Sequence, residues 1–211
     1  MIKQKDKLQT VCLKQPLPMN NITVNMLHRL MYVITIFYFV GCGVLPKGIS
    51  YVGEEKVFGK LFNRTFTTLR RDAENWEPAW ELGIAIKPQK DGRIKGIRIK
   101  NPTAGYIRLS VWDADNKQLI QTINANISDT LNYNFNYCEI PITANKTYCI
   151  SINVRKYYYY TLPFNPLPLN ANNISVLYSV YEETPYQRFP QNNVPSVYHG
   201  LIDLDVDFKT N

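Results

Sequence analysis

The chain has 211 residues, of which 45% are hydrophobic and 19% are charged, a composition that supports one folded domain and excludes a disordered chain or a coiled coil. Its net charge of +7 is concentrated in residues 1–41, because the remaining residues hold nineteen basic and sixteen acidic side chains, a charge of only +3. That excess is too small to indicate a nucleic-acid partner, and two histidines with four scattered cysteines exclude most zinc-ligand arrangements.

The first element in chain order is an apolar segment, residues 30–40, which follows His28 and Arg29 and ends at Gly41-Cys42-Gly43. A membrane-spanning helix needs roughly 20 apolar residues, so this segment is too short to cross a bilayer. A short apolar run between a basic residue and small residues is typical of an export signal, although a buried strand or helix is the alternative. We expect residues 1–41 to lie outside the fold, with residues 1–25 preceding the true translation start at Met26.

The end of this segment also indicates how the exported chain is processed. Phe39-Val40-Gly41-Cys42 resembles the lipobox of bacterial lipoproteins, with Phe39 where that motif has Leu. The resemblance implies that Cys42 carries a lipid, and each buried acyl methylene contributes about 0.8 kcal/mol to membrane binding. We therefore expect a membrane-anchored lipoprotein of the cell envelope, with the outer membrane as its location.

Residues 42–52 are expected to form a tether, and residues 53–211 a single β-sandwich domain. Between the tether and residue 81 the sequence has little regular periodicity. From Leu82 onward apolar residues alternate with polar or small ones, as in half-buried antiparallel strands. The expected strands are residues 82–86, 97–99, 107–111, 119–123, 133–142, 148–154, 157–161, 174–181 and 201–208. About nine or ten strands without helices to cover them predict an all-β fold, a jelly-roll-like antiparallel β-sandwich.

A family resemblance supports this fold. The residues that carry it lie, in order, at Glu81-Leu82-Gly83-Ile84, at 92–98, at 109–114, at 141–148, at Phe189-Pro190 and at 198–208. Together they resemble a bacterial family known only as domain of unknown function 4082, an extracytoplasmic β-sandwich module, most strongly over residues 81–208. The resemblance implies the fold and the location but supplies no catalytic residues.

Candidate catalytic and metal-binding groups are few. Asp203, Asp205 and Asp207 alternate along one strand, which is typical of a solvated face that discourages edge pairing. Oxygen atoms that converge at a strand end would also suit calcium, so Asp203 and Asp205 are candidate calcium ligands. His199 has no nucleophile elbow to pair with, and a strand-edge histidine is the simpler interpretation. The sequence therefore predicts a protein that is not an enzyme and that has no cofactor.

Cys138 and Cys149 flank a short turn on neighbouring predicted strands. After export they would meet an oxidising compartment, and a disulfide between them would contribute about 3 kcal/mol. Two free core cysteines are an equal alternative, because adjacent strands do not ensure that the two Cβ atoms face each other.

Exposed aromatic residues are the candidates for ligand binding. In the run of tyrosines at 157–160 successive side chains must alternate faces, so two of the four should point outward. Sugars bind where their C–H faces stack on aromatic rings and nearby polar groups take the hydroxyls. The candidate contacts are Tyr158, Tyr159, Tyr186, Arg188 and Phe189; core packing is the simpler interpretation of the aromatic residues.

These observations predict a non-enzymatic, membrane-anchored lipoprotein that acts as a binding or structural module. Its partners would be the membrane through the lipid anchor and a glycan or an envelope protein, with no nucleic acid. A carbohydrate-binding module is the second hypothesis. A hydrolase that uses Asp203 or Asp205 with His199 is a third.

Overall fold

The computed structural model describes residues 49–54, 56–59, 68–72, 77–162 and 167–210. The chain divides into two compact units at Gly48, and every described residue belongs to the second unit, Ile49–Asn211. The predicted signal segment, Cys42 and residues 43–48 of the predicted tether lie outside the described residues. Within these ranges no helix has the length and hydrophobicity that a membrane span needs.

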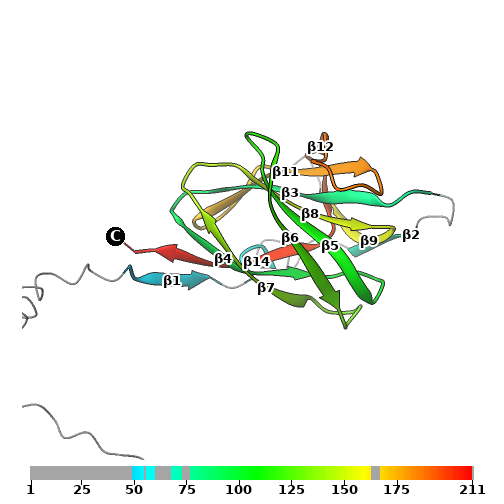
Figure 1. Cartoon of the computed structure of the whole chain (residues 1–211), viewed down its shortest axis with the longest axis horizontal. Coiled ribbons are helices and arrows are strands. Elements are labelled where there is room, and N and C mark those ends of the chain that lie inside the picture. Colours follow the sequence, from blue (N-terminus) through cyan, green and yellow to red (C-terminus); the bar gives the residue numbers. More distant parts are fainter. Residues whose placement is uncertain (1–48, 55, 60–67, 73–76, 163–166, 211) are drawn as a thin grey trace, which may run out of the picture. The chain divides into compact units, whose positions relative to one another are not determined.

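Fourteen β-strands make up the described part of the chain (Figure 1). Nine correspond to the predicted strands: β3 (Trp80–Pro88), β4 (Gly92–Ile99), β5 (Gly105–Asp113), β6 (Gln118–Ile127), β7 (Asn134–Ile142), β8 (Tyr148–Val154), β9 (Lys156–Thr161), β11 (Ile174–Glu183) and β14 (Ile202–Lys209). Five shorter strands were not predicted: β1 (Tyr51–Glu54), β2 (Thr68–Asp72), β10 (Leu169–Ala171), β12 (Asn192–Val194) and β13 (Val197–His199). The last two residues of the predicted tether, Tyr51 and Val52, therefore belong to a strand.

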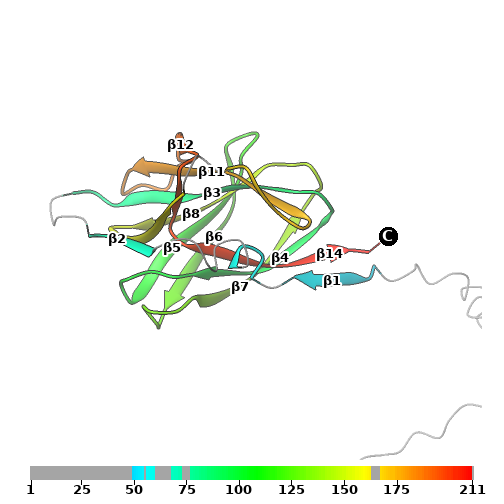
Figure 2. The ribbon, with the colours of Figure 1, turned by 180° about the vertical axis from the view of Figure 1, so that it is seen from behind.

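The strands form three antiparallel sheets. One sheet has the order β1-β14-β4-β7, and a larger one has the order β10-β11-β3-β8-β5-β6 with β12 paired to β11. These two sheets pack face to face as a sandwich (Figures 1 and 2). A small third sheet, β13-β9-β2, lies at one end of the sandwich, beside β3 and β11.

The core lies between the two large sheets and follows the period-two pattern of the sequence. Leu82, Ile84 and Ile86 of β3 are fully buried and belong to the same cluster as Ile97 and Ile99 of β4. Each fully buried side chain of this size stabilises the fold by about 1.5–3 kcal/mol relative to its exposed state. The alternating apolar side chains that predicted these strands are therefore the ones that form the core.

The other face of β14 differs from the sequence expectation. Asp203, Asp205 and Asp207 are only 3%, 4% and 6% exposed, so the prediction that they form a solvated face is wrong. Arg98 donates two hydrogen bonds to Asp205, and Arg93 and Lys95 each form an ion pair with Asp207 at 3.0 Å. The neighbouring strand β4 supplies these partners: Arg93 lies directly opposite Asp207, and Arg98, which lies opposite Asp203, reaches diagonally to Asp205.

Asp203 is held differently, by the main chain. The backbone N–H groups of Phe58, Gly59 and Leu204 donate hydrogen bonds of 2.7, 2.9 and 2.8 Å to its carboxylate. Burial raises the pKa of Asp203 and outweighs these three hydrogen bonds, which lower it. Residues 56–59 therefore cover this part of β14 and stabilise the carboxylate that they bury.

Candidate ligand-binding pocket

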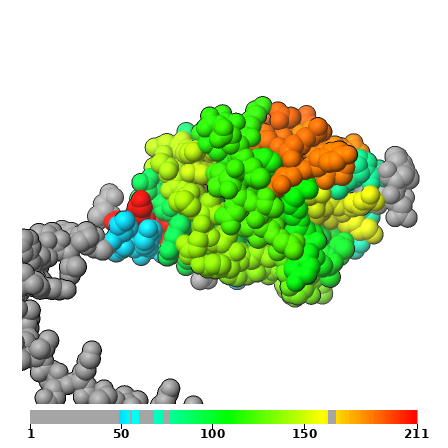
Figure 3. Space-filling model, viewed as in Figure 1, coloured from blue at the N-terminus to red at the C-terminus, as the bar shows by residue number. Residues whose placement is uncertain are grey.

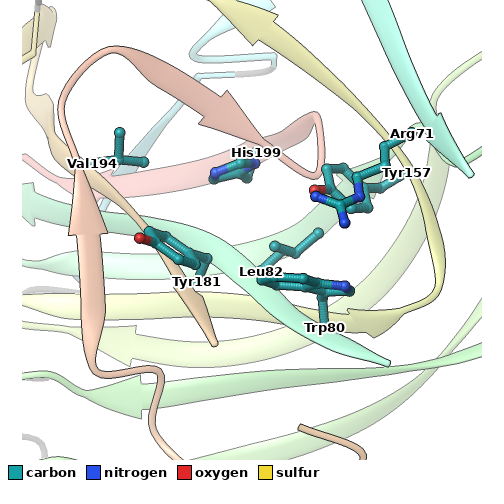
Figure 4. A pocket seen from close by; sticks show the side chains of 7 residues that line it. All are labelled: Arg71, Trp80, Leu82, Tyr157, Tyr181, Val194 and His199. Carbon is teal, nitrogen blue, oxygen red and sulfur yellow. The ribbon is translucent and has the colours of Figure 1, made fainter. Parts of the chain in front are cut away.

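A pocket with a volume of about 240 Å³ opens between the three-stranded sheet and the seven-stranded sheet. It is smaller than the roughly 300–1,000 Å³ that drug-sized ligands occupy, so its size suits a single ring. In Figure 4 the side chains face one another across an open space, with Tyr181, Leu82 and Trp80 on one side and Val194, His199 and Tyr157 on the other. The described residues that line it are Arg71, Trp80, Leu82, Tyr157, Tyr181, Val194 and His199.

Strand register places these residues. Arg71 of β2 lies directly opposite Tyr157 of β9, and Leu82 of β3 lies directly opposite Tyr181 of β11. The two pairs belong to different sheets, and the pocket forms where those sheets approach each other. His199 is the last residue of β13, so the chain enters the pocket there before it turns at Gly200, whose φ is +75°.

The pocket walls are a connected group of aromatic rings. The Trp80 and Tyr181 centroids are 6.3 Å apart, and the His199 ring lies 5.9 Å from Tyr181 and 5.8 Å from Tyr157. These separations are within the range of favourable aromatic pairs. The walls therefore present several ring faces and edges to whatever occupies the space.

Two ring nitrogens of this group are buried without a partner. Among the described residues neither His199 Nδ1 nor Trp80 Nε1 has a hydrogen-bond partner. Burial and, to a smaller extent, the positive charge of Arg71 lower the pKa of His199 to about 4, so the imidazole is neutral at pH 7. A neutral imidazole has one donor and one acceptor nitrogen, whereas an indole N–H only donates. Of the two unpaired nitrogens, the indole N–H can only donate, whereas the imidazole nitrogen donates or accepts according to its tautomer.

The predicted ligand contacts on β9 are more enclosed than expected. Tyr157 is 4% exposed, and Tyr158, Tyr159 and Tyr160 are half-buried. Tyr159 shares the pocket face, with its ring 6.4 Å from His199, whereas the Lys100 ammonium lies 5.4 Å from the Tyr158 ring on the opposite face. Alternation of the side chains is confirmed, but neither face points freely to solvent because β9 is the central strand of a sheet packed against the core.

The other predicted contacts, Tyr186, Arg188 and Phe189, lie in the connection between β11 and β12 (orange in Figure 3). The Phe189 ring packs edge-on against Trp112 with centroids 6.0 Å apart, and Arg188 forms an ion pair with Glu182. Tyr186 is 75% exposed. The structure therefore does not bring the five predicted residues together.

The predicted disulfide is not formed. Cys138 and Cys149 are both buried free thiols. Cys138 lies in the core between the sheets, whereas Cys149 belongs to a separate cluster with Trp112 and Val180. Since β7 and β8 belong to different sheets, the two thiols are not on neighbouring strands, and the alternative of two core cysteines holds.

The predicted calcium site has no support in the structure. Asp203 and Asp205 hold backbone N–H groups and Arg98 instead of converging on a common point. Across the described ranges no group of three or more acidic, histidine or cysteine side chains is arranged to hold a metal ion. The carboxylate oxygens are occupied by the protein's own donors.

Sequence reasoning missed most of the pocket. Arg71 and Val194 were not among the predicted contacts, Trp80 and Tyr181 were candidates only as members of the aromatic set, and His199 was interpreted as a strand-edge residue. The available signal was the density of aromatic residues near Trp80 and at 157–160. The pairing of β9 with β2 and β13 brings Arg71 and His199 to these tyrosines, and the contact of β13 with β3 brings them to Trp80.

Fold and pocket together define a β-sandwich domain with a small aromatic pocket at one end. The chain belongs to the family described as domain of unknown function (DUF4082), which it matches over residues 67–199. The resemblance noted over 81–208 is thus confirmed over residues 81–199, and the match also includes Arg71 and every other described lining residue. No curated protein matches the chain.

Proposed function

We propose that this protein is a non-enzymatic lipoprotein of the bacterial cell envelope whose sandwich domain binds one sugar unit of a glycan in the aromatic pocket. The observation that carries the proposal is the pair of buried, unpartnered ring nitrogens, His199 Nδ1 and Trp80 Nε1, among aromatic faces. A buried polar group without a partner costs about 1–3 kcal/mol, a cost that a bound ligand relieves.

A sugar fits this environment for two reasons. Its C–H face packs on the Trp80 and Tyr181 rings, and each hydroxyl both donates and accepts a hydrogen bond, which suits an indole N–H and a neutral imidazole together. Binding is favoured over hydrolysis because the groups of the hydrolase hypothesis have separate partners. His199 lines the pocket, Asp205 is paired with Arg98, and Asp203 accepts hydrogen bonds from backbone N–H groups.

We further infer that the sandwich is a jelly roll. Its support is the strand order: when β1, β3, β4, β5, β6, β7, β8 and β14 are numbered one to eight along the chain, the two sheets have the orders 1-8-3-6 and 2-7-4-5. This arrangement is that of two interleaved Greek keys. Two sets of strands are then additions: β10, β11 and β12 extend the second sheet beyond β3, and β2, β9 and β13 form the third sheet. Both sets contribute residues to the pocket.

The sugar proposal is tested by two-dimensional ¹⁵N–¹H spectra of the full chain, titrated with neutral and acidic oligosaccharides. The indole N–H signal of Trp80 should shift on binding, while that of Trp112 should not, because Trp112 Nε1 already donates to Ser151 Oγ at 2.9 Å. Trp80→Phe assigns the signal.

Affinity measurements on matched variants complete this test. Tyr181→Ala should weaken binding at least tenfold, whereas Tyr186→Ala, which removes an exposed ring outside the pocket, should leave it unchanged. The proposal fails if no glycan shifts the Trp80 signal of the folded chain, or if Tyr186→Ala weakens binding as much as Tyr181→Ala.

The envelope location is tested separately, by labelling cells with a clickable palmitate analogue and fractionating their membranes. Label and membrane association should both disappear in Cys42→Ser. A Cys42→Ser protein that still carries label, or that stays in the membrane fraction, contradicts the anchor without affecting the pocket.

A further inference from the structure

Arg71 differs from the other residues of the pocket by its charge. It is the only cation among the seven described lining residues, and none of the seven is an acid. Its guanidinium lies 5.0 Å from the centroid of the Trp80 ring. This wall of the pocket therefore repels cationic groups and attracts anionic ones.

The guanidinium retains the capacity to bind a ligand. Its ion pair with Glu77 has an N–O distance of 3.7 Å, longer than the roughly 2.7–2.9 Å of a charge-assisted hydrogen bond, and the two side chains are 43% and 20% exposed. A guanidinium has five N–H donors in a planar fork, which matches the two oxygens of a carboxylate. Stacking on Trp80 holds that plane in a defined orientation.

We infer that the pocket takes an acidic sugar, a single hexuronic acid ring at the end of a glycan, with its carboxylate bound by Arg71 and its hydroxyls at His199 and Trp80. This inference rests on the proposed function and specifies its ligand. A small inorganic anion would leave the Trp80 and Tyr181 faces uncovered, and a neutral sugar would leave the guanidinium with no anionic partner closer than Glu77 at 3.7 Å. A hexuronic acid uses the aromatic, neutral polar and cationic parts of the pocket together.

Direct titration of the full chain tests the inference, with glucuronic and galacturonic acid compared with glucose and galactose at low and high salt. The wild type should bind an acid at least tenfold more tightly than its neutral counterpart, because a charge-assisted pair forms only with the acid. Raising the salt concentration should weaken acid binding and leave neutral-sugar binding nearly unchanged.

Variants of two adjacent arginines provide the control. Arg71→Gln should reduce the preference for the acid to about onefold while neutral-sugar affinity stays within about threefold. Arg70→Gln should change neither value, because Arg70 lies opposite Tyr158 on the other face of the sheet and pairs with Asp72 at 3.0 Å.

The possible failures are distinguishable. Equal wild-type affinity for acids and neutral sugars, or an unchanged preference in folded Arg71→Gln, overturns this inference and leaves sugar binding intact. If no sugar of either class binds the folded wild type, the proposed function itself fails. If Arg71→Gln does not fold, Arg71→Lys provides the test. It keeps the charge but removes the planar fork, so the acid preference should fall without disappearing, and an unchanged preference overturns the inference.

Discussion

Buried polar atoms occur at two places that lie close together in the sequence, the carboxylates of β14 and the His199 Nδ1 atom at the end of β13. The two places differ in hydrogen bonding. On β14, Asp203 accepts hydrogen bonds from three backbone N–H groups. Asp205 accepts hydrogen bonds from Arg98. At the end of β13, His199 Nδ1 has no such partner among the described residues. Satisfied buried groups stabilise a fold, whereas an unsatisfied one in a folded domain calls for an explanation, which the sugar that we propose for the pocket would supply.

The largest expected effect concerns the β14 carboxylates. Asp205→Asn should lower the free energy of unfolding by about 3 kcal/mol, because it breaks a largely buried ion pair in which the Arg98 and Asp205 side chains are 19% and 6% exposed. Urea unfolding followed by circular dichroism measures the change. The matched control is Asp72→Asn, which breaks an Arg70 pair whose side chains are both 48% exposed and should cost less than about 0.5 kcal/mol. Equal costs for both variants would show that the β14 pair contributes no more than a surface pair.

A second, smaller effect tests whether satisfied groups matter in the other sheet. Ser151 Oγ accepts from Trp112 Nε1 at 2.9 Å and donates to the buried Glu81 at 2.6 Å. Ser151→Ala should destabilise the domain by about 2 kcal/mol, since it leaves the indole N–H unpaired. Ser175→Ala, which removes an exposed hydrogen bond to Asn170, should change stability by less than about 0.5 kcal/mol. A near-neutral Ser151→Ala would mean that the buried network is not needed for stability.

The smallest effect is the pH dependence that His199 contributes. Its pKa is lowered from 6.5 to about 4 by burial and by Arg71, so the unfolded chain binds more protons than the folded one between these values. The contribution of the neutral imidazole to the free energy of unfolding is complete above pH 6.5 and is lost as the pH falls toward 4. At pH 5 the loss should be on the order of 1 kcal/mol, with partial exposure allowed for.

The measurement is urea unfolding of wild type and His199→Gln at pH 7.5, 6 and 5. The wild type should lose more stability than the variant over this range, because Gln does not titrate. Equal losses of stability in the wild type and the variant would show that a group other than His199 titrates over this range. They would also contradict the lowered pKa of His199 in the pocket.

The long strands could be predicted from sequence because each carries its own pattern. β8 was predicted with the boundaries it has, since Ile150 and Ile152 alternate with Cys149 and Ser151. Strands of three residues, such as β12 and β13, are too short for any periodicity to emerge. The acidic residues of β14 show the limit of the same method, because alternation identifies a face without revealing what covers it.

The pocket could be predicted only in part. Aromatic residues were identified as ligand contacts, and alternation at 157–160 placed Tyr157 and Tyr159 together. The partners that complete the site are distant in sequence, as the pairing of Arg71 with Tyr157 shows. A single sequence contains no signal for such pairing, so the pocket emerges only from the tertiary structure.

The position of β14 also determines when the domain can fold. It is the last of the described strands, yet it lies between β1 and β4 in the four-stranded sheet and pairs with both. Until residues 202–209 have been synthesised, β1 has no neighbour in that sheet and one edge of β4 is unpaired. Since non-local pairing of this kind is slow, we expect the four-stranded sheet to be the last part of the sandwich to form.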